Sequence, residues 1–275
     1  MSWRLWLLFV LTQPGLCEPS SLSARLGAAD QLLAKHKWVE ALQSYRSILA
    51  DQPACKEAVY GTGWVYNQQG KFDLSVPCLT QASLSWPEDF RIWNELGYAF
   101  YRLGNVEKAC EAYTRAAELD KTSYQSYRFL GDVLYDFKRE TGLILAAYQK
   151  ALDRGCSDPL VYYRMGWCLN ERGEFAQAAV PLRLSVAAAP GMAVSWRELG
   201  YALLRSGEIE ESARALRKAI SLDPGLRLAH LYLGRACLLQ KDVVGAQKEV
   251  NLLRNLDPEL SRQLQLELDK SKPPQ

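Results

Sequence analysis

The chain has 275 residues, enough for one or two domains of ordinary size or for one elongated array. Apolar residues make up 48% and charged residues 23%, a composition that excludes a wholly disordered or fibrous protein. Thirty-three Lys and Arg against 31 Asp and Glu leave a net charge of +2, too balanced for the basic surface of a dedicated nucleic-acid binder.

The first segment, residues 1–17, resembles a short secretory signal. Arg4 precedes an apolar run from Leu5 to Leu11, Pro14 ends any helix, and small residues lead to a predicted cleavage after Cys17. The run is shorter than the roughly 20 residues that span a bilayer. We therefore expect an exported protein, in a periplasm, a lumen or the extracellular space. A lipid anchor on Cys17, an uncleaved tether that associates with the membrane, and a cytoplasmic chain remain the alternatives.

The rest of the chain is built from an internal repeat. One glycine recurs in similar surroundings at a spacing of 34 residues, with a single spacing of 35, at Gly63, Gly97, Gly131, Gly166, Gly200 and Gly234. The text around it also repeats, as in Trp93-Asn-Glu-Leu-Gly-Tyr98 and Trp196-Arg-Glu-Leu-Gly-Tyr201. Each unit continues with apolar residues at i, i+4 and i+7, the period of one helix face.

The turns of each unit are marked by Gly and Pro. Four glycines occupy one repeat position where a helix ends in a left-handed cap: Gly70, Gly104, Gly173 and Gly207. Prolines then stop the second helix, at Pro53, Pro87, Pro190, Pro224 and Pro258. The pattern predicts two helices per unit, with one extra residue in the fourth unit near 138–142.

This pattern resembles the tetratricopeptide repeat (TPR) family. The residues that carry the resemblance in the third unit are Trp93, Leu96, Gly97, Phe100, Ala109, Tyr113 and Ala116. The resemblance implies an all-α fold, a right-handed α-solenoid of about seven helix-turn-helix repeats. They cover residues 22–258, with starts near 22, 56, 90, 124, 159, 193 and 227. Residues 259–275 are predicted as a capping helix and a polar tail, with Leu260, Leu264 and Leu268 on the buried side.

The signature positions of this family serve packing, so the sequence predicts no catalytic residue. His230 stands where Trp93 and Trp196 stand in their units, and we expect a packed histidine with one satisfied nitrogen. His36 falls in a turn and is expected to be exposed. Cys168 and Cys237 are expected to pack as small hydrophobes. No CxxC or HExxH spacing occurs, and we therefore expect neither a metal site nor a cofactor.

In the family, first helices line a concave groove that binds a protein or peptide partner. Its positions predict a set of groove residues in this chain: Trp64, Asn67, Arg91, Asn94, Tyr98, Tyr101, Arg102, Arg128, Tyr163, Trp167, Asn170, Arg197, Tyr201 and Arg205. Large aromatics at the ninth repeat position, such as Trp64 and Trp167, are a departure from the family. These rings either contact a ligand or pack against a neighbouring repeat.

The charges among these positions favour an extended peptide with some acidic character. The resemblance thus implies an interaction scaffold or assembly factor that binds a partner in the groove without catalysis. A carbohydrate-binding TPR protein of an envelope or polysaccharide export system is the alternative, because Trp and Tyr also stack on sugars. An architectural role through self-association is a third hypothesis, and the oligomeric state is left open.

Overall fold

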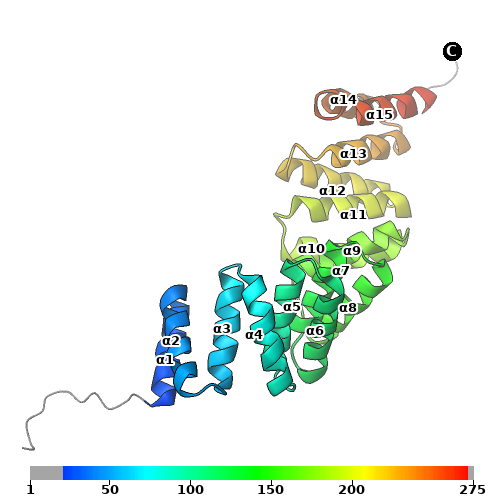
Figure 1. Ribbon diagram of the computed structural model, residues 1–275. Coiled ribbons are helices and arrows are strands. Elements are labelled where there is room, and N and C mark those ends of the chain that lie inside the picture. The colour runs from blue at the N-terminus through cyan, green and yellow to red at the C-terminus, as the bar shows by residue number, and fades with distance from the viewer. Residues whose placement is uncertain (1–20, 272–275) are drawn as a thin grey trace, which may run out of the picture. The chain divides into compact units, whose positions relative to one another are not determined.

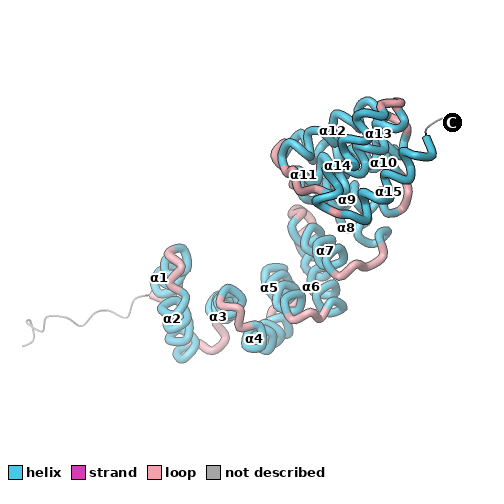
Figure 2. The backbone as a smooth tube through the Cα atoms, turned by 90° about the horizontal axis from the view of Figure 1, so that it is seen from above, coloured by secondary structure: helices cyan, strands magenta, loops and turns pink. Residues whose placement is uncertain are grey.

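The computed structural model describes residues 21–271 of the protein, and all regular structure in that range is α-helical (Figures 1 and 2). The predicted signal-like segment, residues 1–17, and the last residues of the predicted tail, 272–275, lie outside the described residues. The described helices divide into two compact units that meet between Leu119 and Asp120. The all-α class predicted from the repeat pattern is confirmed.

The first unit holds six helices that pack in chain order, each against the next. Their bounds are α1 Leu22–Ala34, α2 Trp38–Asp51, α3 Lys56–Gln68, α4 Phe72–Ser85, α5 Phe90–Arg102 and α6 Val106–Leu119. The odd-numbered helices also contact one another, α1 with α3 and α3 with α5. This is the stacking of helical hairpins that defines an α-solenoid.

The second unit repeats that arrangement with nine helices. Their bounds are α7 Gln125–Asp136, α8 Thr141–Asp153, α9 Pro159–Glu171, α10 Phe175–Ala188, α11 Ala193–Ser206, α12 Ile209–Leu222, α13 Arg227–Leu239, α14 Val243–Leu256 and α15 Pro258–Ser271. Here α9, α11 and α13 lie side by side, and α15 packs on both α13 and α14. The division of the whole chain into seven repeats stays a prediction.

The turns between paired helices use the left-handed backbone that the glycines predicted. Gly104 and Gly173 both have φ 75°, a conformation that costs glycine no steric clash. His36, Lys138 and Lys241 take the same conformation in the turns that lack glycine. Because α7 ends at Asp136 and α8 begins at Thr141, the turn around Lys138 is one residue longer than the turn around Gly104, as the single 35-residue spacing predicted.

The recurring glycine lets paired helices approach closely. A methyl group on Gly166 of α9 would lie 2.3 Å from Cγ of Leu182 on α10. The same addition to Gly200 of α11 would lie 2.5 Å from Cγ of Leu216 on α12. Both leucines are fully buried, so the glycine makes the hollow that each leucine fills.

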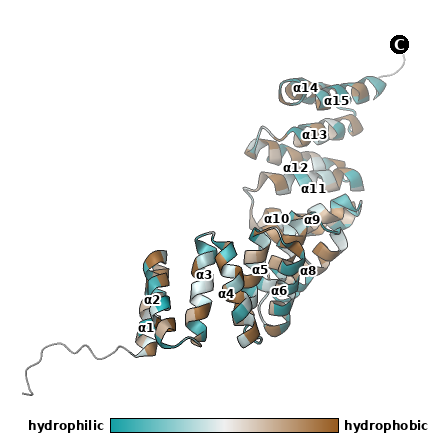
Figure 3. Ribbon diagram, viewed as in Figure 1, coloured by the Kyte–Doolittle hydropathy of each residue, from teal (hydrophilic) through white to brown (hydrophobic). Residues whose placement is uncertain are grey.

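The helix α15 covers the end of the second unit. Leu264 and Leu268 are 0% exposed, and Leu264 lies against Gly234 of α13. The predicted capping role of this segment follows from that burial. Apolar and polar residues alternate along the helices (Figure 3), and within residues 21–271 no helix is both long and apolar enough to cross a membrane.

Candidate ligand-binding face

Each unit presents a face made by its neighbouring first helices, which we call the first-helix face. In the first unit it comprises α3 and α5, and in the second α9, α11 and α13. Most of the predicted groove residues lie on these helices. The contacts of these residues within each unit show which side chains are open to a ligand.

Two aromatic side chains hold Arg102 in place in the first unit. Nη1 of Arg102 donates to the hydroxyl oxygen of Tyr98 at 2.6 Å, one turn earlier on α5. The guanidinium carbon lies 4.8 Å from the ring centroid of Phe72 on α4, and the Phe72 and Tyr98 rings meet edge to face at 5.9 Å. Arg102 is exposed, so its remaining donors face solvent.

The second unit contains the same arrangement around Arg205. Nη1 of Arg205 donates to the Tyr201 hydroxyl at 2.9 Å, and its guanidinium carbon lies 4.3 Å from the Phe175 ring centroid. Phe175 and Tyr201 meet edge to face at 5.6 Å, and Tyr201 also stacks on Tyr232 of α13. Arg205 is likewise exposed. Both arginines are therefore held in place by aromatic rings while their charge remains accessible.

A buried amide joins neighbouring first helices in each unit. Nδ2 of Asn67 on α3 donates to the backbone oxygen of Glu95 at 2.9 Å and to its Oε2 at 2.8 Å. Asn170 on α9 makes the same two bonds to Glu198 on α11, at 3.2 and 3.0 Å. Asn67 is 2% exposed and Asn170 5%, and the Oδ1 atom of each has no hydrogen-bond partner.

These groups form two copies of one cluster. The first cluster is Tyr60, Asn67, Phe72, Glu95, Tyr98 and Arg102, and the second cluster is Tyr163, Asn170, Phe175, Glu198, Tyr201 and Arg205. Every residue of the second has the type of its counterpart 103 positions earlier, as 163 − 60 = 103 shows for the first pair. Each unit therefore carries one copy of the same set of six side chains, spread over two neighbouring hairpins.

The other predicted groove arginines are neutralised within the protein. Arg91 binds both oxygens of Asp89, Arg128 lies 3.0 Å from Asp132, and Arg197 binds Glu198. Arg102 and Arg205 differ, since the structure pairs neither with a carboxylate among the described residues. They are the two cations of the predicted set that remain available to an anionic ligand.

The predicted aromatic residues pack against the preceding repeat. The Trp64 ring meets Trp38 of α2 edge to face at 5.5 Å, and the Trp167 ring meets Tyr135 of α7 in the same way at 5.1 Å. Both tryptophans remain half-buried, as do Asn94 and Tyr101 of α5 and Tyr163 of α9. Ligand contact by these residues stays a prediction.

A further polar cluster in the second unit surrounds Asp132 of α7. Tyr148 donates its hydroxyl to Asp132 at 2.9 Å, and Arg164 of α9 binds Asp132 and Asp136. Burial raises the pKa of the Asp132 carboxyl against the opposing effect of Arg164. These bonds tie α7, α8 and α9 together, so this cluster serves the internal packing of the unit.

His230 is packed, but the prediction of one satisfied nitrogen is wrong. Its Nδ1 lies 2.6 Å from Oε2 of Glu249, and its Nε2 lies 3.1 Å from the carbonyl oxygen of Pro224. Because both partners are acceptors, the geometry favours a ring that carries a proton on each nitrogen. The hydrogen bond that His230 donates to Glu249 is the main cause that raises the pKa of His230.

Sequence reasoning missed Glu95, Glu198, Phe72 and Phe175. Glu95 and Glu198 directly precede the Leu-Gly pair in the repeated Trp-x-Glu-Leu-Gly-Tyr text, and Phe72 and Phe175 follow the turn glycine at the same distance. The signal was present in the repeated text, but no ligand contact was predicted for these four positions. Within residues 21–271 no group of three His, Cys, Asp or Glu side chains is arranged to hold a metal ion.

A model of the tetratricopeptide repeat family matches residues 26–76, 68–124 and 197–255, together more than half of the chain. The chain therefore belongs to the tetratricopeptide repeat family.

Two curated relatives match part of the chain. A probable UDP-N-acetylglucosamine–peptide N-acetylglucosaminyltransferase SPINDLY of Hordeum vulgare is 28% identical over 155 residues, 54% of this chain and 16% of that protein. Tetratricopeptide repeat protein 13 of Homo sapiens is 23% identical over 170 residues, 60% of this chain and 20% of that protein. The chain thus spans a fifth or less of the length of these relatives.

Solved structures share the fold. YrrB, described as a TPR protein with an unusual peptide-binding site, superposes with a TM-score of 0.63 at 20% identity over 68% of this chain and 97% of that one. The C-terminal part of a TPR protein from Cytophaga hutchinsonii superposes with a TM-score of 0.68 at 18% identity, over 85% of this chain and 95% of that one. At these identities the likeness concerns the fold.

Proposed function

We propose that this protein is a scaffold or assembly factor that binds an extended segment of a partner protein on its first-helix faces, without catalysis. The observation that carries the proposal is the pair of exposed arginines, Arg102 and Arg205, each held by a Tyr and a Phe and left without a carboxylate. A held guanidinium loses little freedom when it binds a carboxylate through two hydrogen bonds. This favours a segment with acidic side chains.

The fold supports the same proposal. The family relation and the structural likeness to YrrB, whose description names a peptide-binding site, agree with peptide recognition on helical repeats. The duplication of the cluster supplies one anion-binding position in each unit.

The test is a crosslinking and mass-spectrometry comparison of the tagged protein in its own cells. The variant Arg102→Gln with Arg205→Gln is compared with the control Arg46→Gln with Arg214→Gln. Arg46 also donates to a tyrosine hydroxyl, that of Tyr66, but lies on α2, and Arg214 is exposed on α12. We expect partners to be lost from the first variant and kept by the control.

Equal partner sets in both variants would contradict binding at these arginines. Retention on an immobilised polysaccharide that depends on Trp64 and Trp167 would instead favour the carbohydrate-binding alternative. We also propose that the protein is exported, and the same spectra test it. A mature chain that begins near Glu18 supports export, and an intact Met1 contradicts cleavage of the segment.

A further inference from the structure

The two clusters have the same residue types, but a residue beside them differs in charge. Beside the second cluster, Arg197 donates from Nε and Nη2 to Oε1 of Glu198, at 3.1 and 2.5 Å. The residue that corresponds to Arg197 beside the first cluster is Asn94. The hydrogen-bond partner of the Glu95 carboxylate is Asn67. Among the described residues, this carboxylate therefore has an amide donor where Glu198 has an amide and a guanidinium.

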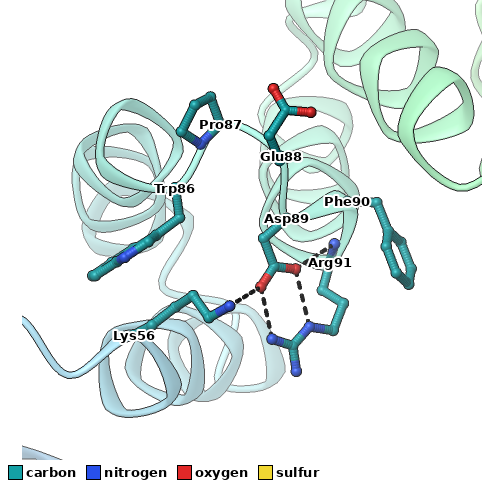
Figure 4. Close-up of a pocket in the computed structure, with 7 residues that line it drawn as sticks. All are labelled: Lys56, Trp86, Pro87, Glu88, Asp89, Phe90 and Arg91. Atoms are coloured by element: carbon teal, nitrogen blue, oxygen red, sulfur yellow. Dashed lines mark hydrogen bonds and ion pairs between the residues drawn. The ribbon is translucent and has the colours of Figure 1, made fainter.

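The nearby cations of the first unit are engaged elsewhere. Arg91 lies one turn before Glu95 on α5, but its Nε and Nη2 bind the two oxygens of Asp89 at 3.0 and 2.7 Å. Lys56 of α3 reaches the same carboxylate at 3.2 Å. Figure 4 shows Lys56 and Arg91 converging on Asp89 in a pocket of about 550 Å³ beside the turn before α5. Both cations are therefore paired with Asp89, and the Arg91 guanidinium also lies 5.0 Å from the centroid of the Tyr60 ring.

We propose that Glu95 binds the guanidinium of an arginine side chain on the partner segment, in the place that Arg197 occupies beside the second cluster. The inference rests on the proposed function and adds the chemistry of one ligand residue. The surroundings of the two positions match. Tyr163 makes a hydrogen bond with Arg197. Its counterpart Tyr60 lies close enough to Glu95 for the Glu95 charge to raise the pKa of Tyr60. The second cluster is then a model of the first with its ligand bound.

The burial of the Glu95 carboxyl favours the binding of a cation beside it, because a cation offsets the lost solvation of the charged form. Desolvation is the main cause that raises the pKa of Glu95 to about 7, and the hydrogen bond from Asn67 opposes it. Tyr60 of α3 is an ionisable neighbour, and burial raises its own pKa to about 12, so it stays neutral at pH 7. The charges of Arg91 and Asp89 also act on Tyr60, and these two groups are paired with each other. A bound guanidinium favours the carboxylate form of Glu95. The affinity of the protein for an arginine-containing segment is therefore expected to fall as the pH drops below 7, by up to about tenfold per pH unit.

The same helix face sets the spacing of ligand charges. Arg102 follows Glu95 by seven residues on α5, about 10.5 Å along the helix axis. An extended peptide covers that distance in about three residues. The segment is therefore expected to carry an arginine and an acidic residue three positions apart.

The test begins with peptides selected from a random 12-residue phage-displayed library on the immobilised full chain. Each enriched peptide is synthesised with arginine and with its neutral isostere citrulline, and affinities are measured by fluorescence anisotropy. For the wild-type protein, citrulline is expected to weaken binding about tenfold or more. For Glu95→Gln, the two peptides are expected to bind alike. Glu118→Gln, which changes an exposed carboxylate of α6 outside both clusters, is the control and should keep the preference for arginine.

A second variant, Asn94→Arg, gives the first cluster the cation of the second and should also abolish the preference for arginine. If circular dichroism shows that Glu95→Gln does not fold, Asn94→Arg is compared with the wild-type protein instead. The inference is overturned if enriched peptides lack arginine, or if citrulline weakens binding equally in wild type and Glu95→Gln. Failure to select any peptide, or binding unchanged in Arg102→Gln with Arg205→Gln, would instead contradict the proposed function.

Discussion

The Glu95 side chain links protonation to the stability of the first unit. Its pKa rises from 4.5 to about 7 on folding because burial disfavours the charged form. Between these values the folded protein binds a proton that the unfolded chain has released. The unfolding free energy contributed by this group therefore falls as the pH rises from 4.5 through 7.

Glu95→Gln removes that cost while keeping a side chain of similar size. We expect the variant to be more stable than wild type at pH 8, by up to about 3 kcal/mol, and close to it at pH 4.5. Urea unfolding at the two pH values measures the difference. Glu198→Gln is the control, and it should destabilise at pH 8 because it leaves Arg197 without its carboxylate. An equal effect of Glu95→Gln at both pH values would contradict the pKa assignment.

His230 gives the second unit a pH dependence in the same direction, for a different reason. Its pKa is raised above 6.5 by the hydrogen bond with Glu249, so the protonated ring stabilises the folded state. That contribution is complete below pH 6.5 and is lost as the pH rises through the folded pKa. We expect His230→Phe to lose stability by about 1–3 kcal/mol at pH 6 and by less at pH 9, measured by urea unfolding. A difference that stays constant with pH would show that the ring is neutral.

At the scale of helices, one hydrogen bond recurs at the start of three first helices. The indole Nε1 of Trp93 donates to the carbonyl oxygen of Pro87 at 2.8 Å, and Trp196 makes the same bond to Pro190 at 2.9 Å. His230 places its Nε2 in the same position against Pro224. Each bond ties a first helix to the proline-containing turn that precedes it. This explains why a histidine can replace a tryptophan there.

The glycine in the middle of the first helices is required for close packing. Gly166→Ala should destabilise by about 1–3 kcal/mol, because the added methyl meets Leu182 inside a filled core. Gly27→Ala in α1 is the control, since nothing lies within 4 Å of its added methyl. It should stabilise by up to about 1 kcal/mol through helix propensity alone. Thermal unfolding of both variants measures the contrast, and a stabilised Gly166→Ala would contradict the packing role.

The helices and turns were the most predictable part of the molecule. The 34-residue period, the apolar spacing and the turn glycines each follow from backbone geometry, so they predict local structure directly. Sequence alone could not show which arginines are paired. Arg91 and Arg102 have the same charge and lie on the same helix, yet only Arg91 meets a carboxylate, from a residue two positions away. Glu95 was missed because its environment depends on Asn67 in the preceding hairpin.

For the molecule as a whole, stability is expected to depend on contacts between neighbouring hairpins. A chain that ends at Asp257 lacks α15, which buries Leu264 and Leu268 against α13 and α14. We expect the amides of α13 and α14 to lose protection in hydrogen exchange while those of α9 and α10 keep theirs. Uniform loss of protection across the second unit would show one cooperative block instead of separable hairpins.

The replacement of tryptophan by histidine at position 230 has a spectroscopic consequence. The indoles of the described second unit are Trp167 and Trp196, on α9 and α11, so none lies on α13, α14 or α15. Tryptophan fluorescence will therefore weight the opening of α9 and α11 more than fraying of the C-terminal helices, whereas far-ultraviolet circular dichroism reports on all helices. Two melting curves that disagree would then mark the order in which the hairpins open.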